Sequence, residues 1–512
     1  QVRYRRPNTI RGDVHTPSND ARRRRSTLLS GMEYATMSLI WTRGSPRWVA
    51  VLRIATATML ALAAAMIVRG IVLADADPSG EATIASDPAA GVTFVWTLIA
   101  GALVFFMQAG FAFLGAGLIR AKNTVNYLTK NILDFAAGGL SFWAFGFAFM
   151  FGGSGAYPGL DNGNALIGYS GFFLTNAAYD VSTSMFWFFQ MVFAATTATI
   201  VAGAMAERTR VTAYLAYSFL VTALIYPIYG HWMWGGGWLG GEQLESWIGA
   251  AAVDFAGSGV VHTIGGMLAL AGAATVGARL GKYGPNGEVR TIKGHNMVYV
   301  VIGTFILFFG WFGFNAGSTV NGNDLRISVI ITNTFLAGAT GAVTAAYVRL
   351  LQTGRISAAD TSNGALAGLV AVTAPCAFIA PWAAVAVGAI GALVMLTGVW
   401  FIDTKLKIDD PVGASSVHGV AGVWGLLAVG IFADGTYGVS GLVAGNAAQL
   451  LAQLIAAVVA VVWALGTGFL LFGALKATIG LRASREEETS GLDIPEHGEE
   501  TYPAETGETL TA

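Results

Sequence analysis

Long runs of apolar residues recur along most of this chain of 512 residues. Two examples are VTFVWTLIAGALVFFMQAGFAFLGAGLI at 92–119 and MVYVVIGTFILFFGWFGF at 297–314. A helix of about 20 apolar residues is long enough to cross the hydrocarbon layer of a membrane. Only 12% of the residues are charged, about half the fraction that a soluble domain carries. The sequence therefore predicts an all-α, multi-pass protein of the cell membrane, with the lipid bilayer as its solvent.

The loops between these runs predict how the chain threads through the membrane. After residue 90 we expect eleven spans, at 92–119, 131–151, 184–206, 211–230, 255–278, 297–316, 327–350, 362–380, 382–402, 415–433 and 446–479. Lysine and arginine fall almost entirely in alternate loops, with Arg326 as the exception. Because such residues mark the cytoplasmic side, the pattern predicts an amino end outside and a carboxyl end inside.

Two similar motifs place ionisable residues inside apolar spans. They are DFAGSGVVHTIGG at 254–266 and DPVGASSVHGVAG at 410–422, and in each the aspartate precedes the histidine by eight positions. Eight helical residues advance the chain by about 12 Å, against a half-thickness of about 15 Å for the hydrocarbon layer. His262 and His418 are therefore predicted near the midplane, reached from opposite sides. Five spans separate the motifs, which predicts two inverted five-helix repeats plus a last helix.

The residue types at this midplane favour a pore over a metal site or an enzyme. A single buried histidine is more often structural, but two at equivalent positions within spans favour a functional role. Two histidines without a third ligand make an incomplete metal site, and the only cysteine is Cys376. No nucleophile accompanies them, so we expect no enzyme activity, no metal and no cofactor. Asp254 and Asp410 are both suited to capping the helices that follow them.

The two ends of the chain differ from the apolar body. Residues 1–90 read as a basic extension followed by a secretory signal segment, with an apolar stretch at 55–68 between Arg53 and Arg69. An ordinary first helix is the alternative reading of that stretch. The arginines at 22–25 indicate an extended reading frame, with a start at Met32 or Met37, more than a nucleic-acid partner. We assign 91–480 to the membrane domain and 481–512 to a cytoplasmic tail.

Four motifs in order along the chain resemble those of the ammonium transporter (Amt/Mep/Rh) family, in its bacterial or archaeal Amt type. They are HWMWGGG at 231–237, DFAGSGVVHTIGG at 254–266, WFGFNAGS at 311–318 and the tail stretch GLRASREEETSGLDIPEHGEETY at 480–502. The resemblance implies a homotrimer with one pore in each subunit. It also implies that the tail is regulatory and binds a cytoplasmic regulator of the PII type.

The same resemblance implies a role for individual residues. In the family an outer site stacks the ammonium ion on an aromatic ring and bonds it to a serine, which correspond to Trp234 and Ser318. Phe193 and Phe314 match two stacked phenyl rings that form a gate, and Phe193 also borders the outer site. Asp254 matches a buried acidic residue that supports ammonium binding through structure and electric field.

The remaining matches lie deeper in the pore. His262 and His418 match the paired pore histidines, Trp311 matches a pore-lining tryptophan and Thr373 a residue of the inner path. The second motif departs from many bacterial members at Gly413, Ser415 and Ser416, and the loop after HWMWGGG is longer.

Together these matches predict an ammonium transporter or channel, with methylammonium as a substrate analogue. Ammonium is expected to be recruited outside, to lose a proton, and to cross the hydrophobic pore as ammonia, with or without the proton. Two alternatives stay open, an ammonium sensor that uses the same pore domain and a neutral gas channel of the Rh type.

Overall fold

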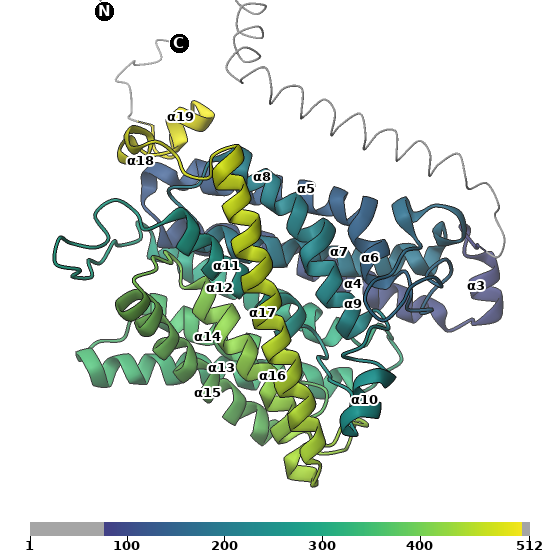
Figure 1. Ribbon diagram of the computed structural model, residues 1–512. Coiled ribbons are helices and arrows are strands. Elements are labelled where there is room, and N and C mark those ends of the chain that lie inside the picture. The colour runs from purple at the N-terminus through teal and green to yellow at the C-terminus, as the bar shows by residue number, and fades with distance from the viewer. Residues whose placement is uncertain (1–75, 504–512) are drawn as a thin grey trace, which may run out of the picture. The chain divides into compact units, whose positions relative to one another are not determined.

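The part of the chain that the computed structural model describes, residues 76–503, consists of helices and loops without a β-sheet (Figure 1). Most of the extension and signal segment predicted for residues 1–90 lies outside the described residues. The α-helices are α3 (Glu81–Ser86), α4 (Ala90–Leu118), α5 (Thr124–Ser141), α6 (Phe147–Phe151), α7 (Val181–Ala204), α8 (Val211–Leu220), α9 (Tyr226–Trp234), α10 (Glu242–Ile248), α11 (Ile264–Val276), α12 (Met297–Gly317), α13 (Ile327–Thr353), α14 (Ala358–Thr373), α15 (Pro381–Phe401), α16 (Ala421–Phe432), α17 (Ala447–Thr478), α18 (Arg485–Ser490) and α19 (Asp493–His497). Five π-helical turns extend or join them: η2 (Phe142–Gly146), η5 (Val221–Ile225), η6 (Ser258–Thr263), η7 (Ile402–Leu406) and η8 (Ser415–Val420).

The predicted class, an all-α multi-pass membrane protein, is confirmed. Within residues 76–503, ten helical segments have at least 18 residues and are apolar enough to cross a membrane. Two of them are joined from shorter helices, α5 to α6 through η2 and α8 to α9 through η5. The remaining predicted range, 362–380, falls on α14, which has 16 residues. The count of eleven spans and the orientation in the membrane stay predictions.

The second span begins earlier than the sequence predicted, at Ala121 instead of residue 131. Lys130, which we placed in a loop, lies inside α5 with 5% of its surface exposed. Its ammonium group lies 3.8 Å from the carboxylate of Glu496 and donates to the carbonyl of Thr209. The polar residues in the first two turns of α5 are stabilised by partners far along the chain, which the hydropathy of neighbouring residues does not reveal.

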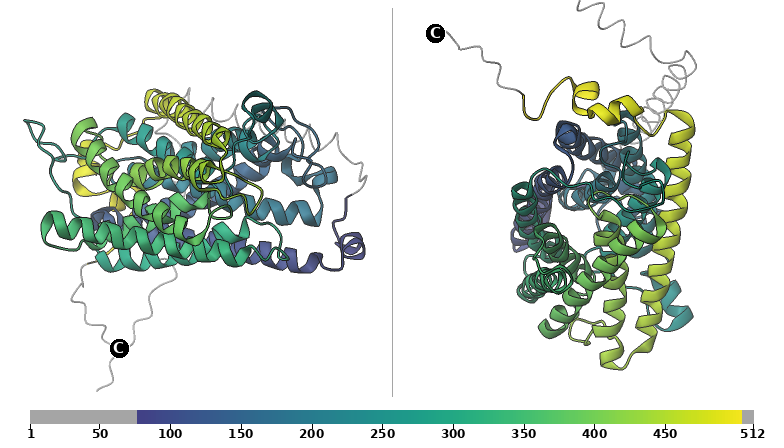
Figure 2. Two further views of the ribbon diagram at one scale, coloured as in Figure 1. Left: turned by 90° about the horizontal axis from the view of Figure 1, so that it is seen from below. Right: turned by 90° about the vertical axis from the view of Figure 1, so that its left-hand side faces the viewer.

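Helices that are distant in sequence pack closely because small residues line their contacts. α4 packs along α12, and α11 packs against both α7 and α17. At Gly303 a Cβ atom would lie 2.4 Å from the backbone nitrogen of Leu114, so only glycine permits this approach of α12 to α4. The long helix α17 lies beside α11 and α16 and leads to α18 and α19, as Figures 1 and 2 show.

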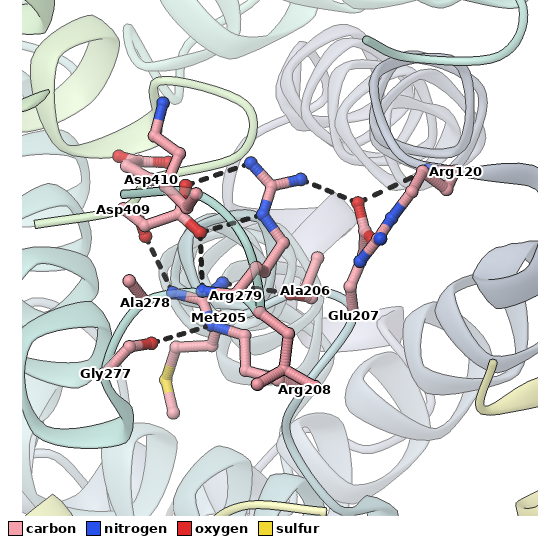
Figure 3. A network of polar contacts seen from close by, with 12 residues as sticks. Arg120, Met205, Ala206, Glu207, Arg208, Gly277, Ala278, Arg279, Asp409 and Asp410 are labelled. Carbon is pink, nitrogen blue, oxygen red and sulfur yellow. Dashed lines mark hydrogen bonds and ion pairs between the residues drawn. The ribbon is translucent and has the colours of Figure 1, made fainter. Parts of the chain in front are cut away.

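A network of charged side chains, most of them buried, joins four loops at one end of the spans (Figure 3). The guanidinium group of Arg279 donates to both carboxylate oxygens of Asp409, at 2.8 and 2.9 Å, and to Glu207 at 2.7 Å. Glu207 also accepts from Arg120, and Arg208 donates to the backbone carbonyl of Asp409 at 2.7 Å. Because each buried charge has a partner, the network avoids the cost of an isolated charge. We call this end, formed by residues 119–123, 205–210, 277–296, 402–414 and 479–503, the basic face.

The carboxyl-terminal segment that includes α18 and α19 folds back onto the basic face. Glu488 is buried and accepts hydrogen bonds from the backbone of Leu280, at 2.6 Å, and from Arg482, at 2.6 Å. Asp493 accepts from the backbone of Asn126 at 2.9 Å, and Lys122 donates to the carbonyl of Glu488 at 3.0 Å. The tail is therefore bonded to α5 and to the loop after α11.

The geometry of Asp409 predicts a pH-dependent contribution to stability. Burial alone would raise the pKa of this carboxyl, but the hydrogen bonds from Arg279 and the charges of Arg208 and Arg279 lower the pKa from 3.8 to about 2. A lowered pKa stabilises the fold above the unfolded value and stops doing so as the pH falls through the folded value. Asp409→Asn should therefore lower the free energy of unfolding by roughly 2 kcal/mol at pH 7. The difference from wild type should shrink between about pH 4 and pH 2.

Thermal unfolding of the detergent-solubilised protein at several pH values measures this effect. Glu288→Gln is the matched control, because Glu288 forms its ion pair with Arg290 at the surface, where both side chains are about half exposed. An Asp409→Asn variant as stable as wild type at pH 7 would contradict the prediction.

Candidate functional site

The two repeated motifs adopt the same local structure. Both carboxylate oxygens of Asp254 accept hydrogen bonds from backbone N–H groups of residues 257–260, at 2.8–3.0 Å. Asp410 accepts from the N–H groups of residues 413–415, at 2.7–3.1 Å. Each aspartate thus caps the start of a helix whose first turn is π-helical, η6 in one motif and η8 in the other. This confirms the capping role that we expected for both aspartates.

The π-helical turns carry His262 and His418 and bring them together. The Nδ1 atoms of the two imidazoles lie 3.2 Å apart, and the rings are stacked with centroids 5.2 Å apart and planes 25° apart. Both residues are buried, at 0% and 4% exposure, and Nε2 of His262 has no hydrogen-bond partner. One Nδ1 must donate and the other accept, so the pair shares one proton between the two rings.

Two glycines permit this contact between the histidines. A Cβ atom on Gly266 would lie 2.0 Å from the backbone nitrogen of Gly419, and one on Gly422 would lie 2.4 Å from the carbonyl of Ser258. The backbones of the two motifs therefore touch directly beside the imidazoles. The glycines beside each histidine therefore allow the two helices to approach closely.

A small cavity of about 150 Å³ lies on the side of the histidines away from the basic face, and we call it the outer cavity. Trp234, Ser318 and Phe193 line it together with Gln190, Phe255 and other apolar residues. The indole N–H of Trp234 donates to the backbone carbonyl of Asp254 at 2.6 Å, which fixes the ring. The carboxylate of Asp254 is used for capping, and its backbone carbonyl holds Trp234 beside the outer cavity.

Aromatic rings fill the space between the outer cavity and the histidines. The rings of Phe193 and Phe314 are in contact and tilted, with centroids 4.2 Å apart and planes 35° apart. The ring of Phe314 lies 5.4 Å from that of His262, which also stacks on Trp311 at 5.1 Å. The indole of Trp311 donates to the hydroxyl of Thr373 at 2.8 Å. Thr373 therefore orients Trp311, and it lines neither the outer cavity nor the inner cavity described next.

A second cavity of about 20 Å³ lies on the other side of the histidines, and we call it the inner cavity. His418 lines it, and the ring of Phe111 lies 5.9 Å from that imidazole. The remaining lining is mostly apolar, with polar groups from Tyr127, Thr199 and Asn363. Such a volume has room for about one water molecule.

The predicted site residues thus form one continuous series of contacts, from the outer cavity through the aromatic rings and the two histidines to the inner cavity. Within residues 76–503, no three His, Cys, Asp or Glu side chains are grouped so that they could hold a metal ion. Fold and site together define a multi-pass membrane protein with two small cavities among its helices, separated by aromatic rings and a buried pair of imidazoles.

Comparison with known proteins identifies the family. Residues 95–502 match the model of the Ammonium Transporter Family. Ammonium transporter Amt2 of Archaeoglobus fulgidus is 51% identical over 443 residues, covering 85% of this chain and 93% of that protein. Ammonium transporter Amt1 of Haloferax mediterranei is 39% identical over 440 residues, covering 82% and 81%. The chain therefore belongs to the ammonium transporter family, and the resemblance seen in its motifs is confirmed.

Solved structures agree with this assignment. A structure titled Sensor Amt Protein is 39% identical, with a TM-score of 0.74, and the match covers 80% of this chain and 100% of that one. Mep2 of Candida albicans is 30% identical with a TM-score of 0.69, covering 78% and 87%.

Sequence reasoning missed polar residues of both cavities. Gln190 lines the outer cavity with 7% of its surface exposed, and its side-chain oxygen has no hydrogen-bond partner. The signal was available, because one amide inside the apolar run FFQMVF is costly to bury. Tyr127 and Thr199 line the inner cavity, and their positions gave no comparable signal, since each occurs among other polar residues or small ones.

Substituting Gly266 tests whether the contact between the two motifs sets the site. Gly266→Ala should lower the stability of the solubilised protein by about 1–3 kcal/mol, because the new methyl group overlaps the backbone of Gly419. Gly473→Ala is the matched control within α17, where a Cβ atom meets no other atom within 4 Å. A shift of the thermal midpoint in the Gly266 variant alone would fit the prediction, and equal midpoints in both variants would contradict it.

Proposed function

We propose that this protein transports ammonium and that the paired histidines lie in its conduction path. The observation that carries the proposal is the contact between the imidazoles of His262 and His418, placed between two small cavities at the crossing of two helices. Membership of the ammonium transporter family gives the substrate class, and methylammonium serves as its analogue.

The outer cavity is the proposed recruitment site for the cation. The indole face of Trp234 supplies a cation–π contact, worth about 2 kcal/mol when the ion is partly desolvated. The hydroxyl of Ser318 and the unpaired side-chain oxygen of Gln190 can accept N–H hydrogen bonds. Ammonium donates such bonds and potassium does not, so these oxygens favour ammonium. Asp254 supports the site by holding the indole through its backbone carbonyl.

Passage beyond the outer cavity requires the rings of Phe193 and Phe314 to separate, so we propose these two residues as the gate. The path beyond them is lined by aromatic rings and imidazoles, and a bare ammonium ion there would lose its hydration without an equivalent replacement. Loss of a proton to the histidine pair removes that cost. We propose that ammonia then moves past His262, Trp311 and His418 to the inner cavity.

Removal of one imidazole tests this path. His262→Ala should reduce ammonium-evoked current in proteoliposomes at least about tenfold, because the remaining imidazole has no partner to share the proton with. The matched control is His295→Ala, which removes a histidine from the basic face, where His295 bonds the carbonyl of Ile119. Unchanged current in the His262 variant would contradict the proposed role.

The same proteoliposomes distinguish transport from its two alternatives, an ammonium sensor and a neutral gas channel. Of these two alternatives, one observation supports the sensor. A structure titled Sensor Amt Protein is 39% identical to this chain. A transporter accumulates methylammonium, whereas a sensor binds it with little accumulation, and a neutral gas channel conducts without current. Wild-type protein that binds methylammonium but does not accumulate it would refute transport and support the sensor.

We further propose that the protein is a homotrimer in the cell membrane and that a PII-type regulator binds its tail. Many large apolar residues are exposed on the single chain, including Phe305 and Leu351, which suits both lipid and subunit contacts. The tail is bonded to α5 and to the loop after α11, so a partner that displaced it would alter the basic face. The mass of the solubilised complex tests the first proposal. Binding of a purified PII-type protein to the full chain, compared with a chain ending at Gly480, tests the second.

A further inference from the structure

A buried aspartate in the second span has no part in the path described so far. Asp134 lies in α5 with 0% of its surface exposed. Its Oδ2 atom accepts a hydrogen bond from the hydroxyl of Thr199, at 2.5 Å, and its Oδ1 atom accepts from the hydroxyl of Ser218. Among the described residues, no lysine, arginine or histidine forms an ion pair with it.

A purely structural role does not account for a carboxyl group at this position. The two hydroxyl groups join α5 to α7 and α8, one at each carboxylate oxygen. An asparagine could bond both hydroxyl groups as well, with its oxygen accepting from one and its NH2 group donating to the other. A carboxyl group inside a membrane span is costly when no cation accompanies it, and such groups commonly act in proton or ion transfer. What distinguishes aspartate from asparagine here is the capacity to gain and lose a proton.

Thr199 connects Asp134 to the conduction path. Thr199 lines the inner cavity together with His418, and the cavity has room for about one water molecule between them. The Thr199 hydroxyl lies within 3.0 Å of three oxygen atoms, from Asp134, Gln108 and the carbonyl of Ala195. A hydroxyl group can donate its proton on one side while it accepts another on the opposite side.

Polar groups continue from Asp134 towards the basic face along the contact between α5 and α8. Lys130 lies one turn from Asp134 on α5, on the side towards the basic face. Tyr214 lies one turn from Ser218 on α8, on the same side. The Tyr214 hydroxyl is buried without a hydrogen-bond partner, and the Lys130 ammonium group lies 5.9 Å from the centre of that ring. Lys130 in turn lies 3.8 Å from the carboxylate of Glu496 in the tail, which is partly exposed.

We propose that Asp134 is a proton-transfer residue, which takes protons from the inner cavity through Thr199 and passes them along Ser218, Tyr214 and Lys130 to Glu496. This inference rests on the proposed transport function and adds the route by which charge leaves the path. It gives ammonia and the proton separate ways to the basic face, so that transport of ammonium moves one positive charge.

The protons balance at each step. Ammonium gives one proton to the histidine pair and continues as ammonia. The imidazole passes that proton, by way of the cavity, to the Thr199 oxygen, while the original hydroxyl proton of Thr199 moves to Asp134. The carboxyl group then releases one proton through the hydroxyls of Ser218 and Tyr214, each of which gains one and loses one. Lys130 then gives one ammonium proton to Glu496 and takes back the proton released by Tyr214, so that it also gains one and loses one. At the basic face Glu496 releases the proton to solvent, and no oxidant or other reactant is needed.

The test compares charge movement with substrate movement in one preparation of proteoliposomes. Methylammonium-evoked current and uptake of labelled methylammonium are measured for wild type and Asp134→Asn. The variant keeps hydrogen-bonding groups but cannot carry a proton. We expect the current per molecule taken up to fall at least about tenfold, while uptake along the concentration gradient stays within about twofold of wild type.

Two further variants keep the test independent of folding. Thr199→Val removes the hydroxyl with little change of volume and should show the same loss of charge per molecule, whereas Thr199→Ser should keep the wild-type ratio. Thr222→Val is the matched control. It removes a buried hydroxyl that bonds Ser141 and lies one turn from Ser218 on the side away from Tyr214. If Asp134→Asn does not fold, the Thr199 pair decides by the same ratio.

Three outcomes would overturn the inference. An unchanged ratio of charge to uptake would mean that the proton takes another route, and an equal fall of both quantities would mean that Asp134 is structural. Wild-type uptake without any current would remove the need for a proton route while leaving transport intact. Wild-type protein with neither current nor uptake would instead overturn the proposed function, and the inference with it.

Discussion

The direct contact between two helix backbones at Gly266 and Gly419 is the constraint on which the site depends. Only because neither residue has a side chain do the two imidazoles come within hydrogen-bonding distance. The aspartate caps serve the same end, since Asp254 and Asp410 fix where each helix begins and hence how deep its histidine lies. The aromatic rings of Phe314 and Trp311 then stack on a histidine whose position is already set.

The helix starts and the basic face follow from one rule, that polar groups inside a membrane protein need partners. The caps satisfy backbone N–H groups at the beginning of the short spans. At the basic face, Arg279 pairs with Glu207 and Asp409 (Figure 3). The tail adds Glu488 as a further acceptor. One bonded network therefore connects the loop before the His418 helix with a tail that we propose as the docking site of a regulator. Through these contacts, a change in the tail can alter the position of the loop before the His418 helix.

Much of the fold and of the candidate site could be predicted from the sequence, because the signals were local and repeated. Hydropathy predicted eleven spans, and ten of them coincide with helical segments within residues 76–503 that are long and apolar enough to cross a membrane. The recurrence of aspartate and histidine eight residues apart predicted the two capped helices. The predicted start of the second span was wrong because the polar residues in the first two turns of α5 are stabilised by Glu496 and Asp493, which belong to the tail. Gln190 and Asp134 were missed for a related reason. The signal for each depends on its surroundings in the fold, which leave the side-chain oxygen of Gln190 without a partner and join Asp134 to Thr199 at the inner cavity.

By itself, the sequence determined that the chain is a multi-pass membrane protein of the ammonium transporter family with two related histidine-bearing helices. Those properties depend on the apolar character and spacing of neighbouring residues, which can be recognised in short stretches of the sequence. Only the tertiary structure decided that the two imidazoles touch, that Thr373 holds Trp311, and that Thr199 joins Asp134 to the inner cavity. Each of these is a contact between spans far apart in the chain, and its distance is set by how closely small residues let the helices pack.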